Sequence, residues 1–279
     1  MSVGIDRLDD FGALREAASA LDEAGIDVMS YGGHVVTSRE GRFDRPTSTY
    51  AAPFRDFFVL FANLAATTKR LRFRSGILIL PLFPTVHVAK QAADLSLLSG
   101  GRFELGVGIS WNEPEYRALG QDMSQRGARL EEQLVVLKRL WTEPFVTFHG
   151  HFHDIDELGL GQMPASPIPI WVGCGESERS LSRVARLADG WMPIGPPSKV
   201  RIDELQAAAT AAGRESFLGV IGRVTWRPDD PDTSIEEART LQAAGVSTIT
   251  ITPPGGTDLA AQVEAVLVAH AALIGALGD

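Results

Sequence analysis

Short apolar segments alternate with longer segments rich in alanine and leucine along almost the whole chain, and this alternation limits the fold more than any other feature. The short segments are almost continuously apolar, as expected of parallel strands buried on both faces. In the longer segments, apolar residues recur at the three- and four-residue spacing of a helix. The predicted strands are residues 3–5, 27–31, 71–80, 103–109, 168–173, 190–194, 217–226 and 247–252. The predicted helices are residues 11–25, 56–68, 86–99, 113–119, 126–141, 177–188, 198–213, 233–245 and 258–276.

Eight strand–helix units in 279 residues predict an α/β fold of the closed (β/α)8, or TIM, barrel type. The rival doubly wound fold would carry a Gly-x-Gly-x-x-Gly fingerprint. In 106-GVGISW-111 the third glycine is replaced by Trp111, and no acidic residue follows at the required distance in a next strand. We expect a single barrel domain over residues 1–279, with insertions at about 32–55 and 143–167. The first insertion follows the second strand, so it opens on the C-terminal face, where barrels build active sites.

Composition narrows the class of protein. The chain has 26 basic and 35 acidic residues and a net charge of −9, which argues against a general nucleic-acid surface. A single cysteine excludes an intramolecular disulfide framework and fits a reducing compartment. No run approaches the roughly 18 consecutive apolar residues of a membrane span, and the N-terminal stretch lacks the features of a secretory signal. We expect a cytoplasmic protein that binds neither membrane nor nucleic acid.

Polar and small residues stand at several predicted strand ends. His34, within 31-YGGHVV-36, lies beside the end of the second strand, and imidazole titrates in the range that suits proton transfer near neutrality. A loop histidine satisfied by its neighbours is the alternative. Ser75, Gly76 and Ile77 interrupt the third strand, which indicates either a simple bulge or the close approach of another group.

The segment 173-GCGESE-178 joins the fifth strand to a helix. Its glycines and Ser177 would leave backbone N–H groups at a helix N-terminus, a favourable position for an anion. Glu176 and Glu178 could occupy this position themselves, and an ordinary capped loop is equally compatible. Cys174 has no strong base nearby in the sequence, so we expect a small buried residue rather than a nucleophile.

Two further groups of residues invite a functional interpretation. His149, His151 and His153 alternate in 149-HGHFH-153, but they lie in the second insertion, away from the strand ends, so we expect a surface hairpin and no metal. Trp111, Trp191 and Trp226 fall at or just past strand ends. They could line an apolar pocket for a planar ligand or pack in the core.

Together these segments resemble the luciferase-like monooxygenase superfamily, and within it the oxidoreductases that depend on the deazaflavin coenzyme F-420. The resemblance runs from about Gly25 to Pro193. It is strongest in residues 60–82, 88–120, 126–144 and 167–195. It implies a (β/α)8 barrel, in agreement with the strand count, whereas roughly the last 80 residues follow the family only by periodicity.

The resemblance also implies where a cofactor would bind. In relatives the tricyclic ring lies at the C-terminal mouth, against the ends of the third and fourth strands. The matching residues here are Ser75, Gly76 and Ile77, where relatives have a non-prolyl cis peptide, and Gly108, Ile109 and Ser110 at the end of the fourth strand. The loop that takes the phosphate side of the cofactor matches Gly173, Cys174, Gly175, Glu176 and Ser177. On this basis the strand glycines would let the ring approach the backbone.

His34 matches a histidine that in relatives lies near the reactive edge of the ring and acts as a base, an acid or a stabiliser of charge. Two positions depart from the family. Gly33 stands where many deazaflavin relatives have an acidic residue, and Trp111 stands near the place where some sugar-oxidising relatives have a glutamate. Both differences weigh against an alcohol dehydrogenase activity.

The leading hypothesis is an oxidoreductase that transfers a hydride between coenzyme F-420 and a small organic substrate at the barrel mouth. The 32–55 loop is the expected lid, with Tyr50 and Arg42 reading the substrate together with Trp111 and Trp226, and Arg223 or Arg42 holding an anionic cofactor tail. The runner-up is a monooxygenase using oxygen and reduced FMN from a separate reductase. A ligand-binding member without catalysis, and a metal-dependent hydrolase built on the 149–153 histidines, are the alternatives of other classes. Relatives suggest a homodimer.

Overall fold

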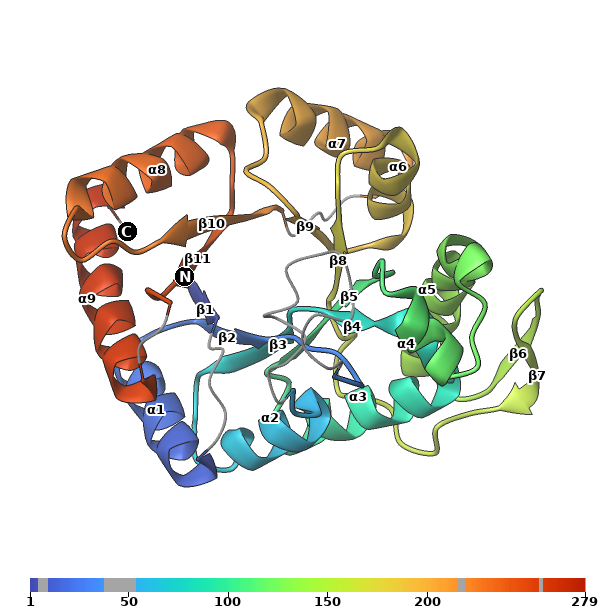
Figure 1. Ribbon diagram of the computed structural model, residues 1–279. Helices are drawn as coiled ribbons and strands as arrows, with labels where there is room; N and C mark the ends of the chain where they lie inside the picture. Colours follow the sequence, from blue (N-terminus) through green and yellow to red (C-terminus); the bar gives the residue numbers. More distant parts are fainter. Residues whose placement is uncertain (5–9, 38–53, 215–218, 256–257, 279) are drawn as a thin grey trace.

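The computed structural model describes residues 1–4, 10–37, 54–214, 219–255 and 258–278, and within them parallel strands form a barrel wall (Figure 1). The wall strands are β1 (Ser2–Gly4), β2 (Val28–Tyr31), β3 (Arg72–Ser75) with its continuation β4 (Leu78–Ile79), β5 (Phe103–Gly108), β8 (Ile170–Cys174), β9 (Gly190–Pro193), β10 (Ile221–Thr225) and β11 (Thr248–Thr252). Each of the eight predicted strands is present. The predicted strand at 71–80 is divided into β3 and β4.

The strands pair in parallel in the order β10–β11–β1–β2–β3–β5–β8–β9. Between the two ends of this order, β9 and β10, the described residues contain one isolated parallel bridge, Trp191 to Val220. The N–H of Trp191 also donates to the carbonyl of Gly219 at 3.1 Å. The wall is therefore a nearly closed (β/α)8 barrel, which confirms the predicted fold class.

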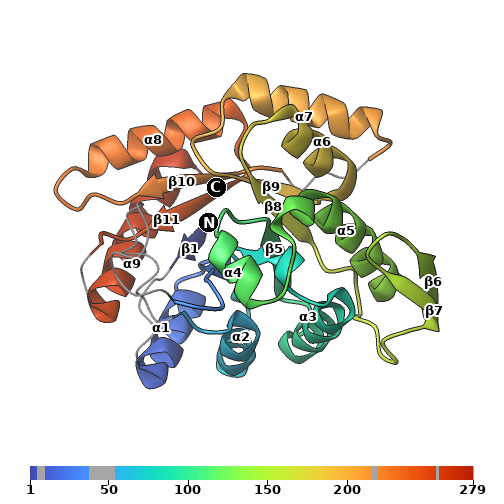
Figure 2. The same ribbon diagram turned by 45° about the vertical axis from the view of Figure 1, so that its right-hand side comes forward.

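Helices surround this wall (Figure 1). They are α1 (Phe11–Glu23), α2 (Phe57–Ala65), α3 (Thr85–Ser99), α4 (Glu113–Ala118), α5 (Arg126–Thr142), α6 (Glu178–Leu187), α7 (Lys199–Ala211), α8 (Pro231–Ala244) and α9 (Leu259–Leu277). Side-chain caps such as Asp10 and Asp56 accept the N–H groups that the first turn leaves unpaired. The short helix α4 lies inside the ring of longer helices (Figure 2), which brings its residues close to the barrel opening.

Among the described residues, buried side chains pack inside the barrel beneath its mouth. Trp171, Met192 and Ile221 form a buried cluster, and the guanidinium of Arg74 lies 4.3 Å from the Trp171 ring centroid. Arg74 is 2% exposed and pairs with Glu104 through its Nε at 2.6 Å.

The interruption of the third strand is a bulge that packs against β5. The Gly76–Ile77 peptide bond is cis. The Ser75 hydroxyl bonds to both the carbonyl and the N–H of Gly106, each at 2.8 Å. A Cβ at position 106 would collide with the Ser75 carbonyl oxygen. Gly106, which is not one of the residues matched to the cofactor, therefore makes room for the protein's own bulge.

The insertion at 143–167 contains an antiparallel hairpin, β6 (Val146–His149) and β7 (Asp154–Leu158), as predicted for the histidine-rich stretch. It projects from the outer side of α5 (Figure 2). In the other insertion, residues 38–53, with Arg42 and Tyr50, lie outside the described part of the chain.

Within the described residues, α9 is the one helix whose length and composition would permit a membrane crossing, with a mean hydropathy of 1.7. Its apolar run is interrupted by Gln262, Glu264 and His270, in line with the expectation that no long uninterrupted apolar segment exists. Helix α9 packs against α1, α8 and β11.

Candidate active site

A cavity of about 460 Å³ opens at the C-terminal mouth of the barrel. It gathers eleven of the residues proposed from the sequence: His34, Gly76, Ile77, Gly108, Ile109, Ser110, Trp111, Gly173, Cys174, Gly175 and Arg223. It also includes residues to which the sequence had assigned no place there, among them Ile79, Ser180, Met192 and Ile194. Segments far apart in the chain therefore meet because the carboxyl ends of all parallel strands lie at one face.

The floor of this cavity consists of backbone and one isoleucine. A Cβ at Gly108 would lie 2.8 Å from Ile77 Cδ1, and a Cβ at Gly173 would lie 3.0 Å from Ile77 Cγ2. The two glycines thus flank the Ile77 side chain, which remains partly exposed. A surface of this kind, apolar and poor in side chains, fits one face of a planar ring.

His34 at the rim of the cavity is held by a buried carboxylate. Its Nδ1 lies 2.6 Å from Oε2 of Glu115, a residue of α4 whose side chain is fully buried. The second carboxylate oxygen accepts the Val35 N–H at 2.6 Å, and the Asn112 side-chain amide donates to Oε2 at 3.3 Å. Glu115 therefore fixes both the orientation of the imidazole and the backbone that carries it.

The charge state of Glu115 follows from these contacts. Burial by itself would raise the pKa of the carboxyl. The hydrogen bond and charge of His34, with the N–H groups of Val35 and Val36, outweigh burial and lower the pKa below its ordinary value. Glu115 is thus an ionised acceptor at neutral pH, and it favours a proton on Nδ1 of His34.

The structure gives a physical reason for the glycine that precedes His34. A Cβ at Gly33 would lie 2.8 Å from Cδ1 of Phe54, whose ring packs edge-on against the His34 imidazole at 5.3 Å. Any side chain at position 33 would therefore have to displace Phe54. In this chain the acidic partner of the histidine comes from α4 rather than from the preceding position.

Glu115 is a candidate functional residue that the sequence did not reveal. It lies within 112-NEPEYRALG-120, at the third position of a short helix. Acidic residues in a first turn are usually solvent-exposed partners of the helix dipole. Only tertiary packing places this one against a histidine 81 positions earlier in the chain.

The residues of the loop proposed for the phosphate side of the cofactor do not all line the cavity. Gly173, Cys174 and Gly175 line the cavity, whereas Ser177 caps α6 by accepting the Ser180 N–H at 3.3 Å. Glu176 lies 3.7 Å from Arg201, so its carboxylate has a partner away from the helix end. Burial raises the pKa of the Cys174 thiol to about 11, which makes a thiolate nucleophile at neutral pH unfavourable.

The three tryptophans near the strand ends also lie in different environments. Trp111 is 44% exposed and lines the cavity, whereas Trp191 and Trp226 are buried in the core and do not line it. Trp191 still supports the site, because its Nε1 donates to the Cys174 carbonyl at 3.1 Å. Ser75 is likewise fully buried behind the cavity and contacts Gly106 rather than the cavity.

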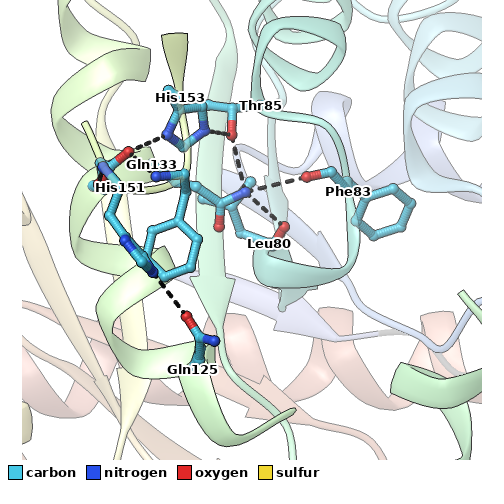
Figure 3. A network of polar contacts seen from close by, with 9 residues as sticks. Leu80, Phe83, Thr85, Gln125, Gln133, His151 and His153 are labelled. Carbon is cyan, nitrogen blue, oxygen red and sulfur yellow. Dashed lines mark hydrogen bonds and ion pairs between the residues drawn. The ribbon is translucent and has the colours of Figure 1, made fainter. Parts of the chain in front are cut away.

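The histidines of the hairpin turn toward separate partners. His153 lies between Glu132, at 2.8 Å from Nδ1, and Thr85, at 2.5 Å from Nε2. Figure 3 shows His153 directed at Thr85 and His151 at Gln125. In the described segments, no group of three or more histidine, cysteine or acidic residues is arranged to hold a metal ion. These contacts instead attach the hairpin to α5 and to the start of α3.

Comparison with known proteins adds to this geometry. The family model described as luciferase-like monooxygenase matches residues 2–269. An uncharacterised protein of Mycobacterium tuberculosis is 45% identical over 144 residues, which cover 51% of this chain and 49% of that protein. The FMNH(2)-dependent dimethylsulfone monooxygenase of Pseudomonas putida is 32% identical over 207 residues, 71% of this chain and 55% of that protein. The alignments thus span about half of these relatives' lengths.

Among solved structures, an F-420-dependent secondary alcohol dehydrogenase in complex with an F-420–acetone adduct superposes with a TM-score of 0.77. The superposition covers 98% of this chain and 97% of that one at 14% identity, so it concerns the fold alone.

Proposed function

Because this chain belongs to the luciferase-like monooxygenase family, we propose that it is an oxidoreductase that binds a tricyclic redox cofactor at the barrel mouth. We propose coenzyme F-420 as the cofactor and hydride transfer to or from a small organic substrate as the reaction. The proposal rests on the His34–Glu115 pair, in which Nδ1 and Oε2 lie 2.6 Å apart. The pair lies at the rim of a cavity that is lined by Gly76 and Ile77 of the bulge.

The residues of the cavity fit such a ring. Gly76, Ile77 and Gly108 would support one face of it, and Gly173 and Gly175 would border its phosphate side. When bound, the deazaflavin supplies a carbon that donates or accepts a hydride. The protein supplies placement of the ring, a dry surface and a proton donor.

His34 is the proton donor or acceptor in this proposal. With Nδ1 protonated toward Glu115, Nε2 is the nitrogen that exchanges a proton with the substrate. The buried carboxylate stabilises the imidazolium that forms when His34 takes up a proton, as a carboxylate does for a histidine in a hydrolase triad. Trp111, exposed at the same rim, would contact the substrate.

A reduced FMN monooxygenase is the second candidate. The relative from Pseudomonas putida, similar over 71% of this chain, is FMNH(2)-dependent by name. The same floor and the same histidine would serve a flavin ring, and oxygen and a separate reductase would then be needed.

Binding of the two cofactors separates the candidates. Purified protein is titrated with coenzyme F-420 and with FMN, and quenching of ligand fluorescence is followed. Micromolar binding of the deazaflavin alone supports the proposal. Binding of FMN with oxygen consumption in the presence of a reductase would replace it with the second candidate, and binding of neither would remove both.

His34→Ala tests whether the site is catalytic. We expect turnover to fall about a hundredfold or more, with cofactor affinity almost unchanged, because the imidazole moves a proton and does not support the ring. An unchanged rate would remove the catalytic role of His34.

A further inference from the structure

A second cavity of about 570 Å³ lies where the barrel wall is least complete. Within the described chain, the Trp191–Val220 bridge is the connection between β9 and β10 in the sheet pairing. Toward the mouth, the end of β9 with residues 194–196, the end of β10 and one side of α8 enclose this space, which we term the seam cavity.

The seam cavity adjoins the candidate active site. Pro193, Ile194 and Arg223 line both spaces. A ligand over the ring site could therefore extend an arm into the seam cavity past these three residues.

Arg223 is the side chain whose positive charge determines which ligand the seam cavity would bind. It is exposed, and it lies on the same face of β10 as Ile221 and Thr225, which line the same cavity. Among the residues that the structure describes, its guanidinium makes no hydrogen bond or ion pair. A guanidinium without a partner in a protein of net charge −9 is a strong attractor for an anion.

The acidic groups near it do not cancel this charge. Glu237 pairs with Arg227 at 2.8 Å, and Glu236 lies 3.7 Å from Arg239. The remaining wall is largely apolar, with threonine hydroxyls as further hydrogen-bond donors. Apolar walls with one fixed cation are the usual composition of a site that orients an anionic ligand.

We infer that the seam cavity binds a phosphate or carboxylate group through Arg223. The group is carried by an arm of the cofactor or by the substrate held over it. The identity of the molecule that carries the anion rests on the proposed function. The presence of an anion site rests on Arg223 alone.

The test compares Arg223→Gln and Arg223→Lys with Arg186→Gln. Arg186 is an exposed arginine paired with Glu131, outside both cavities, and its substitution changes the net charge equally. Calorimetric titrations use coenzyme F-420 and its phosphate-free fragment, FMN and riboflavin, and inorganic phosphate, the last with and without saturating cofactor. Circular dichroism checks that the variants remain folded.

If the cofactor supplies the anion, Arg223→Gln weakens binding of the phosphate-bearing form about tenfold to hundredfold and leaves the phosphate-free form unchanged. Arg223→Lys should lie between wild type and Arg223→Gln. If the substrate supplies the anion, Arg223→Gln leaves both cofactor affinities unchanged. Inorganic phosphate then no longer binds to the cofactor-loaded Arg223→Gln variant. Arg223→Gln behaving like Arg186→Gln for every ligand overturns the inference. Failure of the wild type to bind either ring system would defeat the proposed function instead, and the phosphate titration would still decide on the anion site.

Discussion

At the scale of single residues, the pairing of His34 with Glu115 matters most. The sequence identified the histidine from its place after a strand, but it offered no partner for it. The structure places a fully buried carboxylate 2.6 Å from Nδ1. Burying a carboxylate costs free energy unless it is paired and hydrogen-bonded, and here it has the imidazole, a backbone N–H and an amide. This free-energy cost of burial is expected if the orientation of the imidazole matters for function.

Glu115→Gln tests this positioning role. The glutamine keeps the size of the side chain but loses the charge that stabilises an imidazolium, so we expect kcat to fall about tenfold or more with little change in cofactor Kd. A variant with wild-type kcat and unchanged cofactor Kd would show that Glu115 is only structural.

At the scale of elements, the site depends on how β3 and β5 fit together. The bulge between β3 and β4 is accommodated by Gly106, and the Ile77 side chain lies between Gly108 and Gly173. Gly106 is therefore explained by strand packing, and the packed bulge in turn sets the shape of the cavity floor. A short segment such as FELGVGI cannot disclose which neighbour fills the space above its glycines.

Gly106→Ala should destabilise the barrel. The new methyl group would collide with the Ser75 carbonyl, and overpacking in a core of this kind costs about 1–3 kcal/mol of unfolding free energy. Gly275→Ala is the matched control, since nothing lies within 4 Å of a Cβ there and alanine favours a helix. Urea unfolding should show a clear loss for the first and no loss for the second. Equal stabilities would contradict the packing explanation.

The contact between α1 and the segment that precedes β3 predicts how the stability of the protein depends on pH. Asp22 is 8% exposed, and its carboxylate accepts the backbone N–H groups of Lys69, Arg70 and Leu71 at 2.7, 2.9 and 2.6 Å. Burial would raise the pKa of this carboxyl, but the three N–H groups and the Arg70 charge lower it overall. Its contribution to stability is therefore present above the unfolded-state pKa of about 3.9 and is lost as the pH falls through the lower folded-state pKa.

Asp22→Ala should lower the free energy of unfolding by about 2 kcal/mol or more at pH 7, because it leaves the buried Leu71 N–H without an acceptor. The difference from wild type should shrink at acidic pH. Asp94→Asn, which removes an exposed ion pair with Lys90, is the control and should change stability by less than about 1 kcal/mol. A loss from Asp22→Ala that is the same at pH 3 and pH 7 would show that the charge is irrelevant.

At the scale of the whole molecule, the barrel brings two cavities together at one face, with Arg223 between them. Its incomplete seam explains this arrangement, because β9 and β10 do not form a continuous ladder in the described residues. A ligand that fills the mouth would therefore contact strands from both sides of the seam.

Cofactor binding should consequently stabilise the entire fold. A ligand that binds only the folded state at one hundred times its Kd contributes about 2.7 kcal/mol. For a chain of 279 residues this corresponds to a rise in Tm of about 5 °C. Differential scanning calorimetry with coenzyme F-420, FMN and riboflavin would measure it. No shift with any ring compound at saturating concentration would contradict a cofactor site at the mouth.

The sequence alone determined the eight strand–helix units, hence the barrel, the face on which a site would form and the histidine at its rim. These follow from local periodicity and from the direction of parallel strands, which need no knowledge of distant contacts. The tertiary structure decided that Glu115 is buried against His34, that Gly106 accommodates the bulge and that Arg223 lines two adjoining cavities. Each of these depends on which residues, remote in the chain, are brought together and shielded from water, and no local pattern records that.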